Sequence, residues 1–365
     1  MNNNHENDNS ALHVHEGIEQ PLSFNEDAIS RFKSKRKSGP TVEEFVKGIT
    51  EGNITLLSKA ITLIESALPA HHDKAQQIIE KCLPYTGKSF RIGITGVPGV
   101  GKSTFIESLG TQLTNSGKKV AVLAIDPSSA RTKGSILGDK TRMEKLATDE
   151  NAFIRPSPSA GTLGGVARKT HESIILCEAA GFDTILVETV GVGQSEIAVH
   201  SMVDFFLLLQ LAGAGDELQG IKRGIMEMAD AIVINKAEGD NLRKAELAKR
   251  EYANALHLFP MPESGWSPKV DICSARDNFR VTEVWEMIND YFSFTAQNGY
   301  FLSKRKQQAR HIMHQTIQSN LGDLFYQNQS LKPMIEEMEN KIEKDMISSY
   351  NAAGLLIKEF ISLLK

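Results

Sequence analysis

The spacing of apolar residues changes along the chain and divides it into sections. Between residues 41 and 83, apolar side chains recur at three- and four-residue intervals, as at Val42, Phe45, Val46 and Ile49. This spacing predicts a small helical region. Residues 1–40 lack that periodicity and are rich in Asn, His, Glu and Ser, so we expect a disordered tail there.

From residue 89 the pattern becomes one of alternating strands and helices. Strands are predicted at 90–95, 119–126, 183–188, 204–209, 231–235 and 270–273, and helices between most of them, for example at 103–115, 165–180 and 241–258. Such alternation predicts an α/β fold with a mostly parallel sheet and helices on both faces. After about residue 300 only helical patterns appear. We therefore expect a tail (1–40), a helical region (41–88), an α/β domain (89–297) and a C-terminal helical section (298–365).

Composition and charge exclude several classes of protein. Lys and Arg number 41 against 45 Asp and Glu, a formal net charge of −4, which excludes a strongly basic nucleic-acid binder. The three scattered cysteines indicate a reducing compartment. The first twenty residues carry no secretory signal, and the most apolar stretch, 205–215, is too short to span a bilayer. We expect a cytoplasmic protein that binds neither nucleic acid nor membrane.

A glycine-rich string follows the first predicted strand. Residues 96–104 read GVPGVGKST and match G-x-x-x-x-G-K-[ST] between a strand and a helix. Glycines let backbone N–H groups approach phosphate oxygens, and a helix N-terminus favours negative charge. We expect Lys102 to reach the β- and γ-phosphates of a nucleoside triphosphate and the Ser103 hydroxyl to bind Mg²⁺. The expected binding residues are Gly96, Pro98, Gly99, Val100, Gly101, Lys102, Ser103 and Thr104.

Two later strings predict the base that the nucleotide carries. Asn235-Lys236-Ala237-Glu238 ends a predicted strand where GTPases have N-K-x-D, whose carboxylate accepts hydrogen bonds from the guanine N1–H and amino groups. Glu238 replaces the usual Asp, and its extra methylene moves the carboxylate by about 1.5 Å. Ser274-Ala275 follows the last predicted strand and fits a segment that packs against guanine. These residues favour GTP and GDP over adenine nucleotides.

Further candidates surround the expected γ-phosphate and metal. Glu188 and Gly191 fit the [DE]-x-x-G position, whose acid binds Mg²⁺ through water and whose glycine N–H contacts the γ-phosphate. Asp126 and Asp139 are candidate Mg²⁺ or water-positioning acids, although turns and helix caps also use Asp. In the glycine-rich stretch 212–224, Lys222 or Arg223 could stabilise phosphate charge. Gln194 could orient the attacking water, but it is displaced from the usual position of a catalytic glutamine.

Taken together, these motifs resemble the MeaB/ArgK family of P-loop GTPases. The resemblance runs from about residue 41 to the C-terminus and is carried by the strings GVPGVGKST, AIDPSS, GSILGDKTRM, RPSPSAGTLGGVA, VETVGVGQSE, AGAGDELQGIKRG and NKAEGDN. The family usually has NKADGDN, so Glu238 is a departure. In that family, Asp126, Asp139, Glu188 and Lys222 match residues assigned to Mg²⁺ binding or hydrolysis.

The resemblance also implies a fold and a partner. It implies a P-loop NTPase G domain flanked by an N-terminal helical extension and a C-terminal helical arm that makes a homodimer. It further implies slow GTP hydrolysis and binding to methylmalonyl-CoA mutase or a related adenosylcobalamin-dependent acyl-CoA mutase. There the protein would gate cofactor loading and protect or reactivate the mutase.

Two other functions fit parts of the sequence. A nickel-insertion GTPase would share the nucleotide motifs, but the closest histidine groups are the two pairs His13/His15 and His71/His72. An ATPase or kinase associated with transport of lysine, arginine and ornithine would prefer ATP and would transfer phosphate to protein. A nickel titration and a comparison of ATP with GTP would distinguish these functions.

Overall fold

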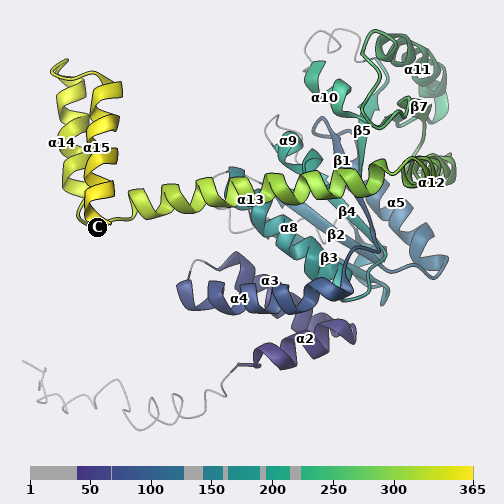
Figure 1. Ribbon diagram of the computed structural model, residues 1–365. Coiled ribbons are helices and arrows are strands. Elements are labelled where there is room, and N and C mark those ends of the chain that lie inside the picture. The colour runs from purple at the N-terminus through teal and green to yellow at the C-terminus, as the bar shows by residue number, and fades with distance from the viewer. Residues whose placement is uncertain are drawn as a thin grey trace, which may run out of the picture. The chain divides into compact units, whose positions relative to one another are not determined.

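The computed structural model describes residues 39–66, 68–126, 143–158, 163–189, 195–213 and 223–364 (Figure 1). Nearly all of the predicted tail, together with Asp139, Gly191, Gln194 and Lys222, lies outside the described residues. The backbone of Asp126 is described but its side chain is not. Residues from Val42 onward form one compact unit.

A parallel sheet forms the centre of this unit. In the described part of the chain it has seven strands in the order β3-β2-β4-β1-β5-β6-β7, and every pairing is parallel. The predicted α/β fold with a mostly parallel sheet is confirmed. The strands are β1 (Phe90–Gly96), β2 (Val120–Asp126), β3 (Ala152–Pro158), β4 (Thr184–Thr189), β5 (Phe205–Leu211), β6 (Ala231–Asn235) and β7 (Lys269–Ile272).

Strand β3 was not among the predicted strands. Its sequence, AFIRPSP, contains few apolar residues and includes Arg155, Pro156 and Pro158. It therefore lacks the continuous β-branched run of the inner strands. Among the described residues it lies at the edge of the sheet and pairs only with β2. Proline is tolerated there because an edge strand has one side without ladder hydrogen bonds.

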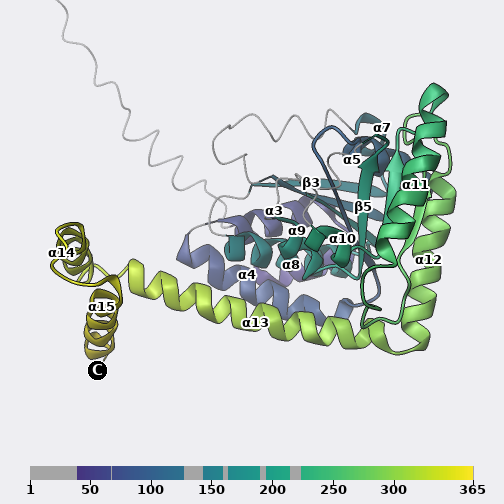
Figure 2. The same ribbon diagram turned by 90° about the horizontal axis from the view of Figure 1, so that it is seen from above.

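Helices cover both faces of the sheet, as the continuous burial along the inner strands requires (Figures 1 and 2). Apolar residues of α2, α3, α4 and α8 pack on one face, and those of α5 and α12 on the other. A third cluster joins α11 to β6 and β7. The helix bounds are α2 (Val42–Thr50), α3 (Ile54–Glu65), α4 (Pro69–Cys82), α5 (Lys102–Asn115), α7 (Glu144–Ala147), α8 (Leu163–Ala179), α9 (Ser195–His200), α10 (Arg223–Met228), α11 (Leu242–Leu256) and α12 (Val281–Gln297).

The residues after 298 are helical, as their pattern predicts. They form α13 (Tyr300–Tyr326), α14 (Lys332–Glu343) and α15 (Ser349–Leu363). Helix α13 lies beside α8 and α12, and α14 packs against α15 (Figures 1 and 2). None of the helices in the described ranges combines the length and apolar character needed to cross a bilayer. The division into a helical region, a G domain and a dimerisation arm stays a prediction.

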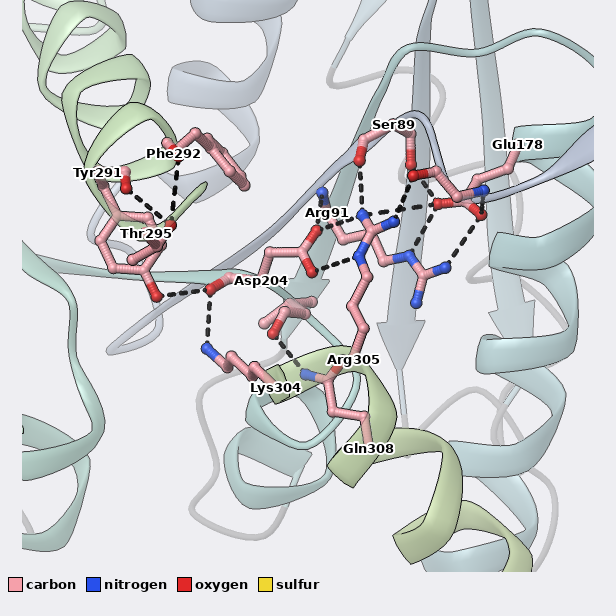
Figure 3. A network of polar contacts seen from close by, with 12 residues as sticks. Ser89, Arg91, Glu178, Asp204, Tyr291, Phe292, Thr295, Lys304, Arg305 and Gln308 are labelled. Atoms are coloured by element: carbon pink, nitrogen blue, oxygen red, sulfur yellow. Dashed lines mark hydrogen bonds and ion pairs between the residues drawn. The ribbon is translucent and has the colours of Figure 1, made fainter. Parts of the chain in front are cut away.

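A buried charged network attaches α13 to the sheet (Figure 3). Arg305 of α13 donates from Nε and Nη2 to the two carboxylate oxygens of Asp204, at 2.8 and 2.7 Å. Arg91 of β1 pairs with Glu178 of α8 at 2.9 and 3.0 Å, and its backbone N–H also donates to Asp204. Lys304 donates to the Asp204 carbonyl at 2.7 Å. These side chains are paired with opposite charge, as buried ions require.

Candidate nucleotide-binding site

The glycine-rich loop connects the end of β1 to the start of α5, as predicted. Gly96, Gly99 and Gly101 have φ of 148°, 78° and 98°, in a region that side chains rarely adopt. A Cβ at Gly96 would lie 2.4 Å from the Leu209 carbonyl oxygen, and one at Gly101 would lie 2.7 Å from Asn235 Nδ2. The loop therefore requires glycine at both positions. Pro98 and Gly99 are exposed, while Val100 is buried.

Lys102 begins α5 and is buried beneath this loop. Its Nζ donates to the Gly96 carbonyl at 2.8 Å and to the Val97 carbonyl at 3.2 Å. Burial lowers the pKa of the Lys102 ammonium, while the carboxylates of Glu188 and Glu196 act in the opposite direction. A phosphate bound at the loop would supply further negative charge and stabilise the ammonium form.

A hydroxyl and a carboxylate meet beside the loop. The Ser103 hydroxyl donates to Glu188 Oε1 at 2.9 Å. Glu188 is buried near the end of β4, and it is brought here because β4 pairs with β1 in the register Ile94 to Glu188. Oxygen donors of these two types are the ligands that Mg²⁺ prefers, so the pair fits that ion. Thr104, on the same helical turn as Ser103, is exposed.

The predicted base-recognition residues converge at the ends of β6 and β7. Asn235 is buried, and its Nδ2 donates to the Val100 carbonyl at 2.9 Å. Its Oδ1 accepts from the Ala275 N–H at 3.1 Å. Asn235 therefore joins the phosphate loop to the Ser274–Ala275 segment, and Ser274 is fully buried. Lys236 is exposed with φ of 60°.

One carboxylate oxygen of Glu238 has no partner among the described residues. Its Oε2 is buried and accepts no hydrogen bond from that part of the chain, while Oε1 lies 3.9 Å from Arg276 Nε. An unsatisfied buried acceptor costs about 1–3 kcal/mol. Paired donors such as the N1–H and amino groups of guanine are the chemical complement of this carboxylate, so the residues present fit a guanine nucleotide.

Sequence reasoning missed the contacts that hold the loop after β7. Asn278, with φ of 53°, accepts through Oδ1 from Ser108 Oγ at 2.8 Å and from Gln112 Nε2 at 2.7 Å. Both donors lie on α5, the helix that follows the phosphate loop. A lone Asn in a turn is the only local sign of this role, because Asn tolerates positive φ better than most residues.

The structure thus brings together most of the predicted site, while part of it remains outside the description. Lys102, Ser103 and Glu188 lie at one place, and Asn235, Glu238, Ser274 and Ala275 at the neighbouring ends of β6 and β7. The predicted roles of Asp126, Asp139, Gly191, Gln194 and Lys222 concern side chains or segments outside the described residues.

Comparisons with known proteins agree with this geometry. A family described as "Methylmalonyl Co-A mutase-associated GTPase MeaB" matches residues 57–330. A probable GTPase of Mycobacterium tuberculosis is 46% identical over 318 residues, which cover 87% of this chain and 95% of the relative. A mouse protein named "Methylmalonic aciduria type A homolog, mitochondrial" is 45% identical over 331 residues, covering 88% of this chain and 80% of the relative.

A solved structure shares the fold over most of its length. The crystal structure of a LAO/AO transport system kinase superposes with a TM-score of 0.71 at 36% sequence identity. The match covers 89% of this chain and 99% of that chain. Because the family match spans more than half of the chain and these relatives align over nearly all of it, the chain belongs to the MeaB family of P-loop GTPases.

Proposed function

We propose that this GTPase binds an adenosylcobalamin-dependent acyl-CoA mutase, with methylmalonyl-CoA mutase as its client. The observation that carries the proposal is the family match over residues 57–330, because that family is described by its association with this mutase. The name of the mouse relative supports the same client. On this proposal, the nucleotide state gates cofactor loading and helps to protect or reactivate the mutase.

The hydrolytic step follows from the groups around the phosphate loop. Water attacks the γ-phosphorus in line, forming a P–O bond while the bond to the β–γ bridging oxygen breaks, and GDP and phosphate leave. Lys102 neutralises charge on the β- and γ-phosphates, and the glycine-rich backbone orients them. Ser103 and Glu188 would hold Mg²⁺, which supplies further charge neutralisation when bound.

Several roles rest on the family resemblance alone. We assign Asp126 and Asp139 to the metal or its waters, the Gly191 N–H to the γ-phosphate, and Lys222 to hydrolysis stimulated by the partner. If Lys222 has that role, Lys222→Ala should weaken mutase-stimulated hydrolysis more than basal hydrolysis. An equal loss in both rates would contradict it.

We further propose that the chain forms a homodimer through its C-terminal helices. Four apolar side chains of α13 are between 48% and 60% exposed, namely Met313, Ile317, Leu321 and Leu324. Their spacing of three and four residues places them along one side of the helix, where a second copy would bury them. Light scattering of the wild-type protein should give twice the 40.2 kDa mass of one chain. The double variant Ile317→Lys, Leu321→Lys should give the mass of a single chain. Gln318→Lys is the matched control.

The proposed compartment is the cytoplasm. Cys82, Cys177 and Cys273 are buried free thiols, which is the usual state in a reducing compartment.

The deciding experiment is GTP hydrolysis by the purified protein during titration with methylmalonyl-CoA mutase, with ATP run in parallel. Saturable stimulation that is specific to GTP is expected. A GTP rate that the mutase leaves unchanged would refute this client. Lys102→Ala should abolish nucleotide binding or turnover, and Lys244→Ala, an exposed lysine on α11, should behave as wild type.

A further inference from the structure

Arg276 lies beside the carboxylate of Glu238, the predicted base-recognition residue that follows β6. It belongs to the loop after β7, directly after the Ser274–Ala275 segment. Its Nε is 3.9 Å from Glu238 Oε1 and 3.0 Å from Asp277 Oδ1. The Arg276 side chain is 72% exposed, whereas that of Glu238 is 19% exposed. An exposed cation therefore approaches a mostly buried anion at the edge of this site.

The position of Arg276 is set by a loop with fixed ends. Ser274 and Phe279 exchange backbone hydrogen bonds of 3.0 and 2.9 Å, and the Asp277 N–H donates to the Ser274 hydroxyl at 3.2 Å. Asn278 is bound to α5, as described above. Asp277 in turn holds the Arg276 guanidinium. The arginine is thus presented by a constrained turn rather than by a free loop.

Because its side chain is longer than that of Asp, Glu238 needs an additional contact to hold its carboxylate in place. A carboxylate that recognises guanine must stay ionised and must direct its oxygens at two neighbouring donors. Glu has one more rotatable bond than Asp, so more conformational freedom must be lost to hold its carboxylate still. A cation next to Oε1 attracts that carboxylate and so restrains its position.

We propose that Arg276 is a positioning residue for base recognition, holding the Glu238 carboxylate toward ligands that carry a purine N1–H and a 2-amino group. The inference rests on guanine-nucleotide binding by this chain and assigns a residue that none of the nucleotide motifs contains. It does not depend on the identity of the client. Because the distance between Arg276 Nε and Glu238 Oε1 is long and Arg276 is exposed, the effect of this ion pair on affinity is modest, about 1.5-fold to fivefold.

A double-mutant cycle tests this role. The dissociation constants of GDP and of inosine diphosphate, which lacks the 2-amino group, are measured by displacement of a fluorescent GDP analogue. The proteins are wild type, Arg276→Ala, Glu238→Asp and the double variant. Arg250→Ala, which removes an exposed arginine of α11, is the control.

The expected pattern is specific. Arg276→Ala should weaken GDP binding by about 1.5-fold to fivefold and should lower the preference for GDP over inosine diphosphate. The loss should shrink in the Glu238→Asp background, because the shorter side chain withdraws from Arg276. It should also shrink at high salt, since exposed charge pairs are screened. In turnover, KM for GTP should rise while kcat stays constant.

Three outcomes would overturn the proposal. They are a GDP affinity that is unchanged or tighter in Arg276→Ala, an equal loss in both Glu238 backgrounds, and an equal loss for both nucleotides. If wild type binds GDP but does not respond to the mutase, the proposed client fails and the role of Arg276 is unaffected. Melting temperatures equal to wild type would show that the turn itself is intact.

Discussion

Removing Arg305 should destabilise the protein far more than removing a typical surface charge. Arg305 binds both carboxylate oxygens of Asp204 and also donates to the carbonyls of Gly87 and Ser89. The Asp204 side chain is only 1% exposed. In Arg305→Ala, the hydrogen bond from the Arg91 N–H to this carboxylate would remain, at 3.0 Å. A buried charge left without its partner costs about 3–5 kcal/mol, and we expect a loss of that size.

The assay is urea unfolding followed by far-ultraviolet circular dichroism, because urea does not screen charge. Lys306→Ala, on the exposed side of the same helix, should change the free energy of unfolding by less than about 0.5 kcal/mol. The double variant Arg305→Met, Asp204→Asn removes both charges and should be more stable than Arg305→Ala. A loss below about 1 kcal/mol in Arg305→Ala would refute the reasoning, since it would mean that the pair is solvated.

Two further predictions concern the phosphate loop and the pH dependence of stability. Gly96→Ala should weaken GDP binding at least about tenfold, because the new Cβ would lie 2.4 Å from the Leu209 carbonyl oxygen. Gly117 also has positive φ, but no atom lies within 4 Å of a Cβ built there, so Gly117→Ala should leave the GDP dissociation constant unchanged. Burial lowers the pKa of His171 and of His200 to about 4 in the folded protein, so the unfolded chain takes up protons first as pH falls. The free energy of unfolding should therefore decrease between pH 6.5 and 4, by up to about 3 kcal/mol for each histidine. Urea titrations at several pH values should show a shallower decrease for His171→Gln, and an unchanged slope would contradict the assignment.

The parts of the site that sequence predicts well are those set by adjacent residues. The phosphate loop needs glycines at fixed spacing between a strand and a helix, so residues 96–104 identify it without any knowledge of the sheet. The sequence could predict that Ser103 and Glu188 both lie at the carboxyl end of the sheet, but not that they are in contact. Ser103 follows β1 and Glu188 lies near the end of β4, and these strands end on the same side of a parallel sheet. The strand order that makes β1 and β4 neighbours comes only from the structure.

Other features were hidden because their chemistry is spread along the chain. Strand β3 is an edge strand with two prolines, so its composition carries the signal of a turn rather than of a strand. Arg305 and Asp204 are separated by 101 positions, and nothing local to either residue indicates the other. Arg276 and Glu238 approach because β6 and β7 are neighbouring strands and the loop after β7 turns back between residues 274 and 279. Neither fact leaves a clear trace in local composition.

The predicted nucleotide-binding residues lie at one end of the sheet and the charged residues that attach α13 lie at the other. This separation explains which residues could be predicted from sequence motifs. The phosphate loop, Glu188, Asn235 and the Ser274–Ala275 segment lie at the carboxyl ends of their strands, where parallel α/β sheets bind ligands. Arg91 and Asp204 lie at the opposite ends of β1 and β5, where α13 attaches. Residues of the first group must match a nucleotide and so recur as motifs. Residues of the second group need only pair opposite charges with one another. Many combinations of residues can do this, so no fixed motif marks them. A substitution in the α13 attachment should therefore change stability before it changes GDP affinity, whereas Arg276 and Gly96 should show the reverse order.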